Sequence, residues 1–308
     1  MKSTVTQLGT GPGMRRVQIC FVAAVSLLLI AAPTGGSSPT KQATTGSETQ
    51  PTPISAKDFN PKRFARSTVI DNAWLPMRPG TQLVFQGWTG EGKERVPHRL
   101  VMTVTGLTKV VGSIRSVVLW DRDFSAGALA EAELAFFAQD NAGNIWETGE
   151  YPEEYENGKV IESPAWIHGV KGARAGITMM AEPRLDTPSY ALGWGPAIGF
   201  NDRGKVLQTG QRSCVPVRCY DNVLVVDEFN PGEPGKHQLK YYAPGVGNIR
   251  VGWTGGNETS KETLVLVKVR RLNAKEIAYV GRQALKLERR AYLRSKNVYG
   301  RTPPLVTP

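Results

Sequence analysis

Carboxylate side chains crowd into residues 121–156 and are the residue types with the most obvious chemistry. Two carboxylates on adjacent strands, near Glu133 and Glu147, could hydrolyse a glycan, and such a group could also hold Ca²⁺. The interpretation that we favour is a solvated acidic face with cross-strand partners such as Arg115 and Arg122. The acidic residues of this stretch are Asp121, Asp123, Glu131, Glu133, Asp140, Glu147, Glu150, Glu153, Glu154 and Glu156.

Histidine and glycine patterns add no catalytic set. His98, His168 and His237 are far apart in the chain, and none stands at a metal-ligand spacing. No Gly-x-Ser-x-Gly element marks a serine nucleophile. The glycine pairs at 193–195 and 245–247 lack the strand-then-helix context of phosphate loops and are interpreted as turns. The sequence therefore predicts no metal, no cofactor and no assignable catalytic residue, and it favours a non-enzymatic protein.

Aromatic residues give one hint of a binding cavity. Trp120, Trp146, Trp166 and Tyr242 are spread through the region expected to form strands. In small β-barrels such side chains fill the interior or line a ligand cavity. Ordinary core packing is the alternative, and the sequence favours it.

The elements that must position these residues are mainly strands. Residues 99–105 alternate apolar and polar side chains, the period of a half-buried strand. Residues 128–139 have a helical composition but run into two phenylalanines, so we expect a strand there. About eleven strands at regular spacing, with no alternation of strand and helix, predict an all-β antiparallel barrel, half-barrel or sandwich. Residues 164–204 show no sustained period and are predicted to be irregular.

The last part of the chain changes pattern. Residues 58–272 are predicted to form the β-rich domain, and 273–295 a basic amphipathic helix that Asn273 caps. This helix is expected to pack on the β domain with a solvated basic face. A helix that also touches an anionic membrane surface is the second interpretation. Residues 296–308 are predicted to be a frayed tail.

The N-terminal segment indicates export. A basic pair at residues 15–16 precedes an apolar run over 19–32, which is typical of a signal peptide or an N-terminal anchor over residues 1–32. Residues 33–57 are rich in Ser, Thr, Gly and Pro and are predicted to be a flexible linker. We therefore expect a periplasmic or extracellular protein, with the N-terminal anchor as an alternative to secretion. In an oxidising compartment Cys214 and Cys219 are expected to form a disulfide.

The charge distribution argues against nucleic acid as a partner. The net charge is +11, and all of it lies in residues 1–57 and 271–308, whereas residues 58–270 are neutral. A nucleic-acid-binding domain would need a basic face of its own. The expected partners are instead a small or lipidic ligand, a cell-envelope component, or a membrane surface that binds residues 273–295.

An ordered set of short motifs carries a family resemblance. The motifs are Ala-Gln-Asp at 138–140, Gly-Asn-Ile-Trp at 143–146, Gly-Glu at 149–150, Glu-Pro at 182–183 and Lys-Tyr-Tyr-Ala-Pro-Gly-Val-Gly at 240–247. Together they resemble a group of secreted or lipid-anchored bacterial proteins of unknown function, over residues 59–252. The resemblance implies an exported, β-rich domain and supplies no activity. The C-terminal helix lies outside it.

Overall fold

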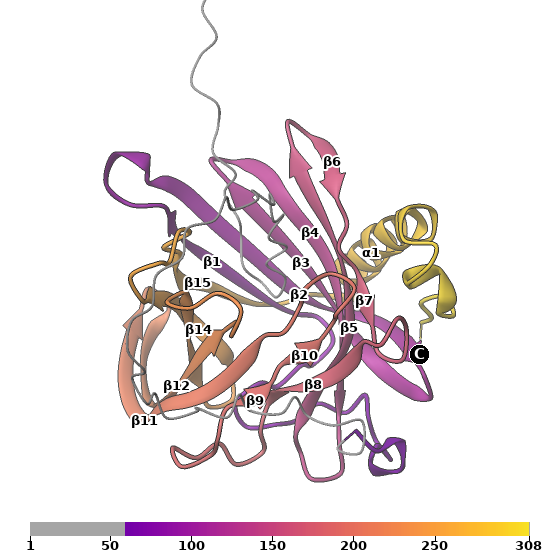
Figure 1. Cartoon of the computed structure of the whole chain (residues 1–308), viewed down its shortest axis with the longest axis horizontal. Helices are drawn as coiled ribbons and strands as arrows, with labels where there is room; N and C mark the ends of the chain where they lie inside the picture. The colour runs from indigo at the N-terminus through magenta and orange to yellow at the C-terminus, as the bar shows by residue number, and fades with distance from the viewer. Residues whose placement is uncertain (1–58, 308) are drawn as a thin grey trace, which may run out of the picture.

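A computed structural model describes residues 59–307 and shows a strongly curved sheet with one long helix on its outside (Figure 1). The helix α1 spans Ala274–Arg294, and short 3-10 turns form η1 (Pro61–Arg63), η2 (Gly92–Glu94) and η3 (Tyr299–Arg301). The strands are β1 (Thr81–Thr89), β2 (Val96–Val111), β3 (Ile114–Ser125), β4 (Ala128–Gln139), β5 (Ile145–Glu156), β6 (Lys159–Glu162), β7 (Trp166–Ile167), β8 (Arg174–Met179), β9 (Tyr190–Ala191), β10 (Gly193–Trp194), β11 (Arg203–Val215), β12 (Arg218–Phe229), β13 (His237–Ala243), β14 (Gly247–Thr254) and β15 (Thr263–Arg271).

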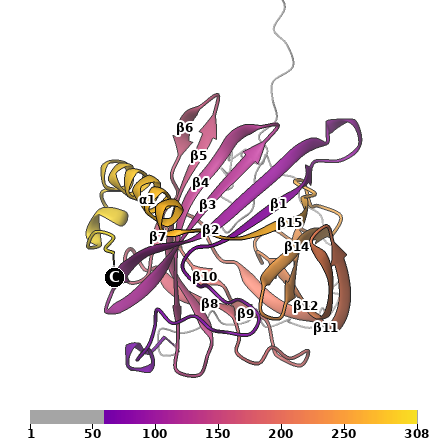
Figure 2. The same ribbon diagram turned by 180° about the vertical axis from the view of Figure 1, so that it is seen from behind.

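All strand pairs are antiparallel, and the sheet runs in the order β10-β8-β5-β4-β3-β2-β1-β15-β14-β13-β12-β11-β9, with β6 and β7 also pairing with β5. The two end strands, β9 and β10, come from one segment, residues 190–194. The sheet therefore curls until both ends reach the same stretch of chain, but it stays open, as both views show (Figure 2). This confirms the predicted all-β antiparallel class and corresponds to its half-barrel alternative.

Strand β4 shows how the sheet separates two cores. Its helix-favouring composition is overridden by pairing with β3 and β5 along its whole length. Leu134 and Phe136 point to the outer face, where they pack in the core under α1. Ala135 and Phe137 point to the inner face, into the core that the curved sheet encloses. Alternation along one strand thus supplies both cores.

The turn between β4 and β5 is organised by Asp140. Its Oδ1 accepts hydrogen bonds from the backbone N–H groups of Ala142 and Asn144, both at 2.9 Å. Its Oδ2 accepts from the Asn144 amide at 3.0 Å and from the indole N–H of Trp146 at 2.9 Å. A carboxylate that accepts four hydrogen bonds holds a tight turn, so the acidic residue here has a structural role.

Residues 164–204 contain the short strands β7 to β10, which the sequence did not predict. Trp166 and Phe200 stack at 5.2 Å between ring centroids in a small core of their own. Strand pairs of two residues, such as Gly193 with Ala175, are too short to produce a visible period. This segment therefore joins the two edges of the sheet although its sequence is irregular.

Helix α1 begins after Asn273, as predicted. The Asn273 side chain accepts a hydrogen bond from the Glu276 N–H at 3.0 Å, and the Glu276 carboxylate accepts one from the Asn273 N–H at 2.9 Å. This reciprocal capping box satisfies two N–H groups that the helix itself leaves unpaired. The buried stripe includes Val280, Ala284 and Leu287 and faces the outer side of the sheet.

The residues after α1 are packed against the sheet, so the prediction of a frayed tail was wrong. Tyr299 is fully buried and Leu305 nearly so, both in the core under α1. Val306 forms a two-way backbone bridge with Thr108 of β2. The turn η3 directs Tyr299 and Leu305 toward the sheet. A short segment with two prolines shows no periodic pattern from which this packing could be predicted.

The disulfide between Cys214 and Cys219 is present and closes the hairpin of β11 and β12. The predicted signal peptide or anchor (1–32) and linker (33–57) lie outside the described residues. Within residues 59–307, no helix combines the length and the apolar character needed to cross a bilayer.

Candidate functional site

The acidic residues of the sequence do not form a solvated face; most are buried, and this is the largest correction to the sequence analysis. Strand β3 places Asp121 opposite Glu133 of β4, and Asp123 opposite Glu131. All four are less than a tenth exposed. They alternate along their strands with outer-face residues and so share the inner face with Ala135 and Phe137. Arg115 and Arg122 do not neutralise this row: Arg115 bonds to the Thr108 hydroxyl and Arg122 lies over the ring of Trp120.

Two further carboxylates join the row through an irregularity in β5. Glu147 and Glu150 are three residues apart, a spacing that would put them on opposite faces of a regular strand. The pairing with β4 shifts between Phe136 and Phe137, so both carboxylates face inward. Gly149, between them, has a φ of 155°, and a Cβ there would lie 2.7 Å from the Trp166 carbonyl oxygen. Only glycine fits this close approach, so the bulge needs it.

These side chains surround a cavity of about 60 Å³, the inner carboxylate cavity. Its polar lining consists of Asp121, Glu133, Glu147, Thr178, Glu150, Glu228, Lys240, Tyr242 and Asn248. The ammonium of Lys240 lies 3.2 Å from a carboxylate oxygen of Glu228. Burial and the mutual repulsion of like charges raise the pKa values of Asp121, Glu147 and Glu150 well above the usual range, and burial raises that of Glu133 to about 7.

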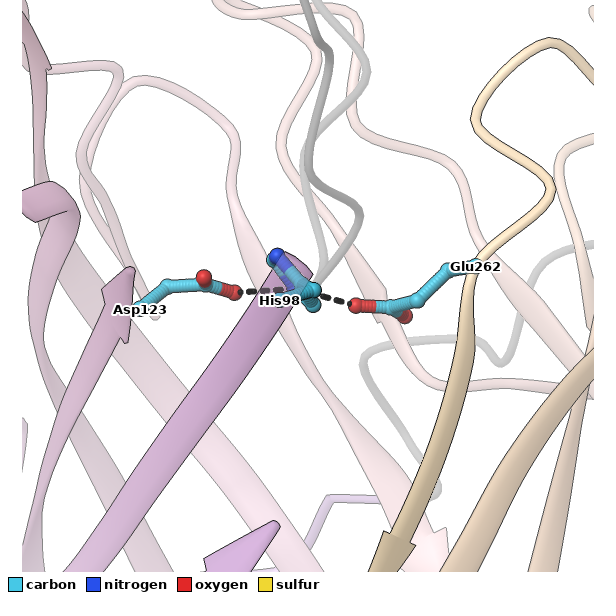
Figure 3. A group of neighbouring side chains, drawn as sticks. All are labelled: His98, Asp123 and Glu262. Atoms are coloured by element: carbon cyan, nitrogen blue, oxygen red, sulfur yellow. Dashed lines mark ion pairs between the residues drawn. The ribbon is translucent and has the colours of Figure 1, made fainter. Parts of the chain in front are cut away.

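A second cluster lies where β2, β3 and the start of β15 meet. The His98 Nε2 atom is 3.1 Å from a carboxylate oxygen of Asp123 and 2.7 Å from one of Glu262 (Figure 3). The other oxygen of Glu262 accepts a hydrogen bond from Gln238 at 2.6 Å. Burial alone would lower the pKa of His98, but the hydrogen bonds and charges of the two carboxylates outweigh it and raise the pKa to about 10. The three side chains could ligate a cation, but a protonated imidazole already supplies the positive charge between the carboxylates.

A much larger opening, which we name the arginine groove, crosses β1, β2, β14 and β15 and has a volume of about 1010 Å³. Three arginines on its walls lie over aromatic rings: Arg95 over Trp88 at 4.4 Å, Arg99 over Phe124 at 5.2 Å, and Arg250 over Tyr241 at 5.8 Å. Apolar side chains such as Val265 and Val267 complete the lining. None of the residues that line it is acidic, and the three arginines are its exposed charges; His98, also in the lining, is paired with Asp123 and Glu262 behind it.

The four aromatic residues proposed as cavity lining do not converge. Trp120 packs in the core under α1, Trp146 against Phe59, and Trp166 against Phe200. Only Tyr242 reaches the inner carboxylate cavity. The three tryptophans therefore have the core-packing role that the sequence analysis gave as the alternative.

Sequence reasoning missed the groove arginines and the paired Lys240. One signal was available: Asp121 with Asp123, and Glu131 with Glu133, repeat at the strand period. A two-residue acidic period predicts one shared face. It does not say that the face is buried, because burial depends on the distant strands that curl over it.

Comparison with protein-family models finds no match, and comparison with curated protein sequences finds none either. Among solved structures, a candidate exported protein with a YmcC-like fold from Bacteroides fragilis is 15% identical with a TM-score of 0.39, and the match covers 65% of this chain and 99% of that one. A candidate lipoprotein from Parabacteroides distasonis is 12% identical with a TM-score of 0.35, covering 65% of this chain and all of that one. Similarity at this level assigns no function, so the proposals below rest on the residues of this chain.

Proposed function

We propose that this chain is an exported, non-enzymatic binding protein that takes an anionic amphiphile, a molecule of lipid type with a negative headgroup, in the arginine groove. The observation that carries the proposal is the lining of this groove: three arginines, three aromatic rings, apolar valines and no carboxylate. Export is supported by the basic pair and apolar run near the N-terminus.

The chemistry of the walls matches such a ligand. A guanidinium group that lies over a ring presents its N–H donors at the edge, where they can bind phosphate or carboxylate oxygens in pairs. Arg250 already donates one N–H to the Cys214 carbonyl at 2.7 Å, so Arg95 and Arg99 are the main anion-binding groups. Val265, Val267 and the ring of Phe124 offer apolar surface for an acyl chain. A volume of about 1010 Å³ lies at the upper end of the range for small-molecule sites.

The inner carboxylate cavity does not suit the ligands considered from the sequence. At about 60 Å³ it has room for about two water molecules, each of which takes about 30 Å³. A lipid or a sugar ring does not fit there. The glycan-hydrolase alternative, which relied on Glu133 and Glu147, is therefore not carried forward, although the structure brings these two carboxylates together.

We expect the full chain to bind dihexanoyl phosphatidylglycerol below its micelle concentration and to bind dihexanoyl phosphatidylcholine at least tenfold more weakly. The double variant Arg95→Gln/Arg99→Gln should weaken binding of the anionic lipid by about tenfold or more, since each charge-assisted hydrogen bond contributes roughly 1.5–3 kcal/mol. Isothermal titration calorimetry measures both differences.

The matched control is Arg184→Gln, an exposed arginine outside the groove that pairs with Glu182. It should bind the lipid as the wild type does. Equal affinity for the two headgroups, or an unchanged affinity in the double variant, would sink the proposal.

A second candidate function is docking of α1 on an anionic membrane surface. Residues spaced by three and four positions form one exposed side of the helix. On this side Tyr279 is 56% exposed and Leu293 is 71% exposed, and both lie between basic residues. The basic residues of this face are Lys275, Arg282, Lys286, Arg289 and Lys296. Cations that flank exposed apolar side chains are typical of helices that lie on anionic lipid. Arg290 is not part of this face, because it pairs with the buried Glu153 at 2.7 Å.

Replacing Arg282, Lys286 and Arg289 by glutamine should reduce flotation of the full chain with phosphatidylglycerol vesicles by about tenfold or more, since each basic residue near such a surface contributes about 1 kcal/mol. Flotation with phosphatidylcholine vesicles should be weak for both proteins. A triple variant of exposed cations elsewhere, Lys93→Gln/Lys159→Gln/Arg212→Gln, serves as the control. If both triple variants float like the wild type, the helix is not the membrane contact.

A further inference from the structure

The inner carboxylate cavity has the geometry of a cation site. One carboxylate oxygen each of Glu133, Glu147 and Glu150 can be chosen so that the three lie within 4.8 Å of one another. All three side chains are at least 96% buried. They come from two neighbouring strands, β4 and β5, whose backbone is held by the sheet on both sides. The three oxygens are therefore presented by a rigid frame.

The charges around this cavity are strongly unbalanced. Five carboxylates line it, those of Asp121, Glu133, Glu147, Glu150 and Glu228. Lys240 is the one basic residue in the lining, and its ammonium lies next to Glu228. Ionised carboxylates at such short separations in a medium of low polarity repel one another strongly. Either bound protons or a bound cation must reduce the negative charge.

Two side chains that face the cavity have an oxygen with no hydrogen-bond partner among the described residues. The Oδ1 atom of Asp121 is one, and Asp121 is more than nine-tenths buried, whereas Glu150 can pair with Glu133 or Glu147 only when one of these carboxyls carries a proton. The Thr178 hydroxyl, which also lines the cavity, has none either. Buried polar atoms are nearly always paired in folded proteins. Asp121 is not one of the three clustered glutamates, so its unpaired oxygen is a separate indication that something else is bound.

We infer that the inner carboxylate cavity binds one Ca²⁺ ion, with Glu133, Glu147 and Glu150 as its protein ligands and Asp121 beside them. Calcium prefers oxygen donors only, accepts six to eight of them at about 2.3–2.6 Å, and tolerates irregular geometry. The charged oxygen donors here are carboxylates, with the hydroxyls of Thr178 and Tyr242 and the amide of Asn248 nearby, and the lining holds no thiol and no imidazole. The remaining coordination positions are filled by water, for which a cavity of about 60 Å³ has room.

The cavity and the arginine groove share no lining residue, so this inference does not depend on lipid binding. The ion offsets part of the negative charge of the inner face and fastens β4 to β5 at the bulge around Gly149. A hard cation therefore serves as a structural ligand of the fold, and its removal weakens this part of the sheet.

The test uses the full chain, stripped with EDTA and dialysed at pH 7.5. Titration with CaCl₂ should give one site per chain by calorimetry, and at one hundred times the dissociation constant Ca²⁺ should raise Tm by roughly 5–10 °C. Glu150→Gln should abolish this Ca²⁺-dependent rise. The same variant should have a higher Tm than the stripped wild type in EDTA, because it removes one of the crowded carboxylates. A variant that merely misfolds cannot show that gain.

Glu156→Gln, at an exposed end of β5, is the matched control and should keep the full response to Ca²⁺. Parallel titrations with MgCl₂ and ZnCl₂ should give weaker binding. The inference is overturned if Ca²⁺ neither binds the stripped wild type nor changes its Tm, since the carboxylates are then neutralised by protons. It is equally overturned if Glu150→Gln responds to Ca²⁺ as the wild type does.

Discussion

Lys109→Ala will lower the free energy of unfolding by about 3–5 kcal/mol, the usual cost of removing one partner of a buried ion pair. The Lys109 ammonium lies 2.9 Å from Glu288 Oε1 of α1, and neither side chain is more than about 5% exposed. It also lies 3.9 Å from the ring centroid of Tyr299. The same oxygen of Glu288 accepts hydrogen bonds from the Tyr299 hydroxyl and the Leu305 N–H. Without Lys109, a buried carboxylate remains with no positive partner.

Urea unfolding followed by circular dichroism measures this loss. Lys286→Ala, an exposed lysine on the same helix, is the control and should change stability by less than about 0.5 kcal/mol. The double variant Lys109→Met/Glu288→Gln should recover much of the loss, because it removes the unpaired charge and keeps an oxygen that can accept from Tyr299 and Leu305. A Lys109→Ala protein as stable as the wild type would show that this ion pair does not hold α1 and the C-terminal residues on the sheet.

The second large effect concerns pH and His98. In the folded protein its pKa is raised from 6.5 to about 10, because the two buried carboxylates around it outweigh the opposing effect of burial. A histidine with a raised pKa contributes stability that is complete below pH 6.5 and is lost as the pH rises toward 10. At about 1.4 kcal/mol per pKa unit, the whole change is on the order of a few kcal/mol. Asp123 has a pKa raised to about 6, mainly by burial, so its destabilising effect develops at lower pH, from about 4 to 6.

The wild type should therefore lose stability between pH 7 and pH 9.5, and His98→Gln should be less stable at pH 6.5 with a shallower slope above it. The slope that remains belongs to the buried carboxylates of the inner cavity, whose pKa values are also raised. Urea unfolding at several pH values measures the slope. His237→Gln is the control, because that histidine is partly exposed and pairs with Asp227 at 2.9 Å. An identical slope in the wild type and His98→Gln would mean that His98 does not carry the proton between Asp123 and Glu262.

Local signals in the sequence were sufficient for most of the elements. The cap at Asn273 and the apolar stripe of α1 predicted the helix to within one residue at each end. The alternation of residues 99–105 predicted part of β2, and the two phenylalanines of β4 outweighed its helical composition. The tail failed because Tyr299 and Leu305 are isolated apolar residues without a period, and only their contact with α1 and β2 orders them.

The candidate sites were much less accessible. Trp88, Tyr241 and the three groove arginines lie in two segments, 88–99 and 241–250, with 141 residues between them, and the sequence contains nothing that pairs these segments. His98 and Glu262 are brought together in the same way by the pairing of β1 with β2 and β15. Residues this far apart in the chain come together only through the order of all the strands in the sheet, and no local sequence pattern predicts that order.

The carboxylates of residues 121–156 show most clearly which features follow from local sequence patterns and which depend on the pairing of distant strands. Their spacing of two residues already places Asp121 with Asp123, and Glu131 with Glu133, on one face of a strand each. That this face is the inner one follows from the order of strands in the sheet, because burial arises when β12 and β13 curl over it and bring Glu228 and Lys240 to the same cavity. The bulge at Gly149 then turns Glu147 and Glu150 to one side, against the strand period. A solvated acidic face and a buried cation site differ only in what lies above them, and that is a property of the fold.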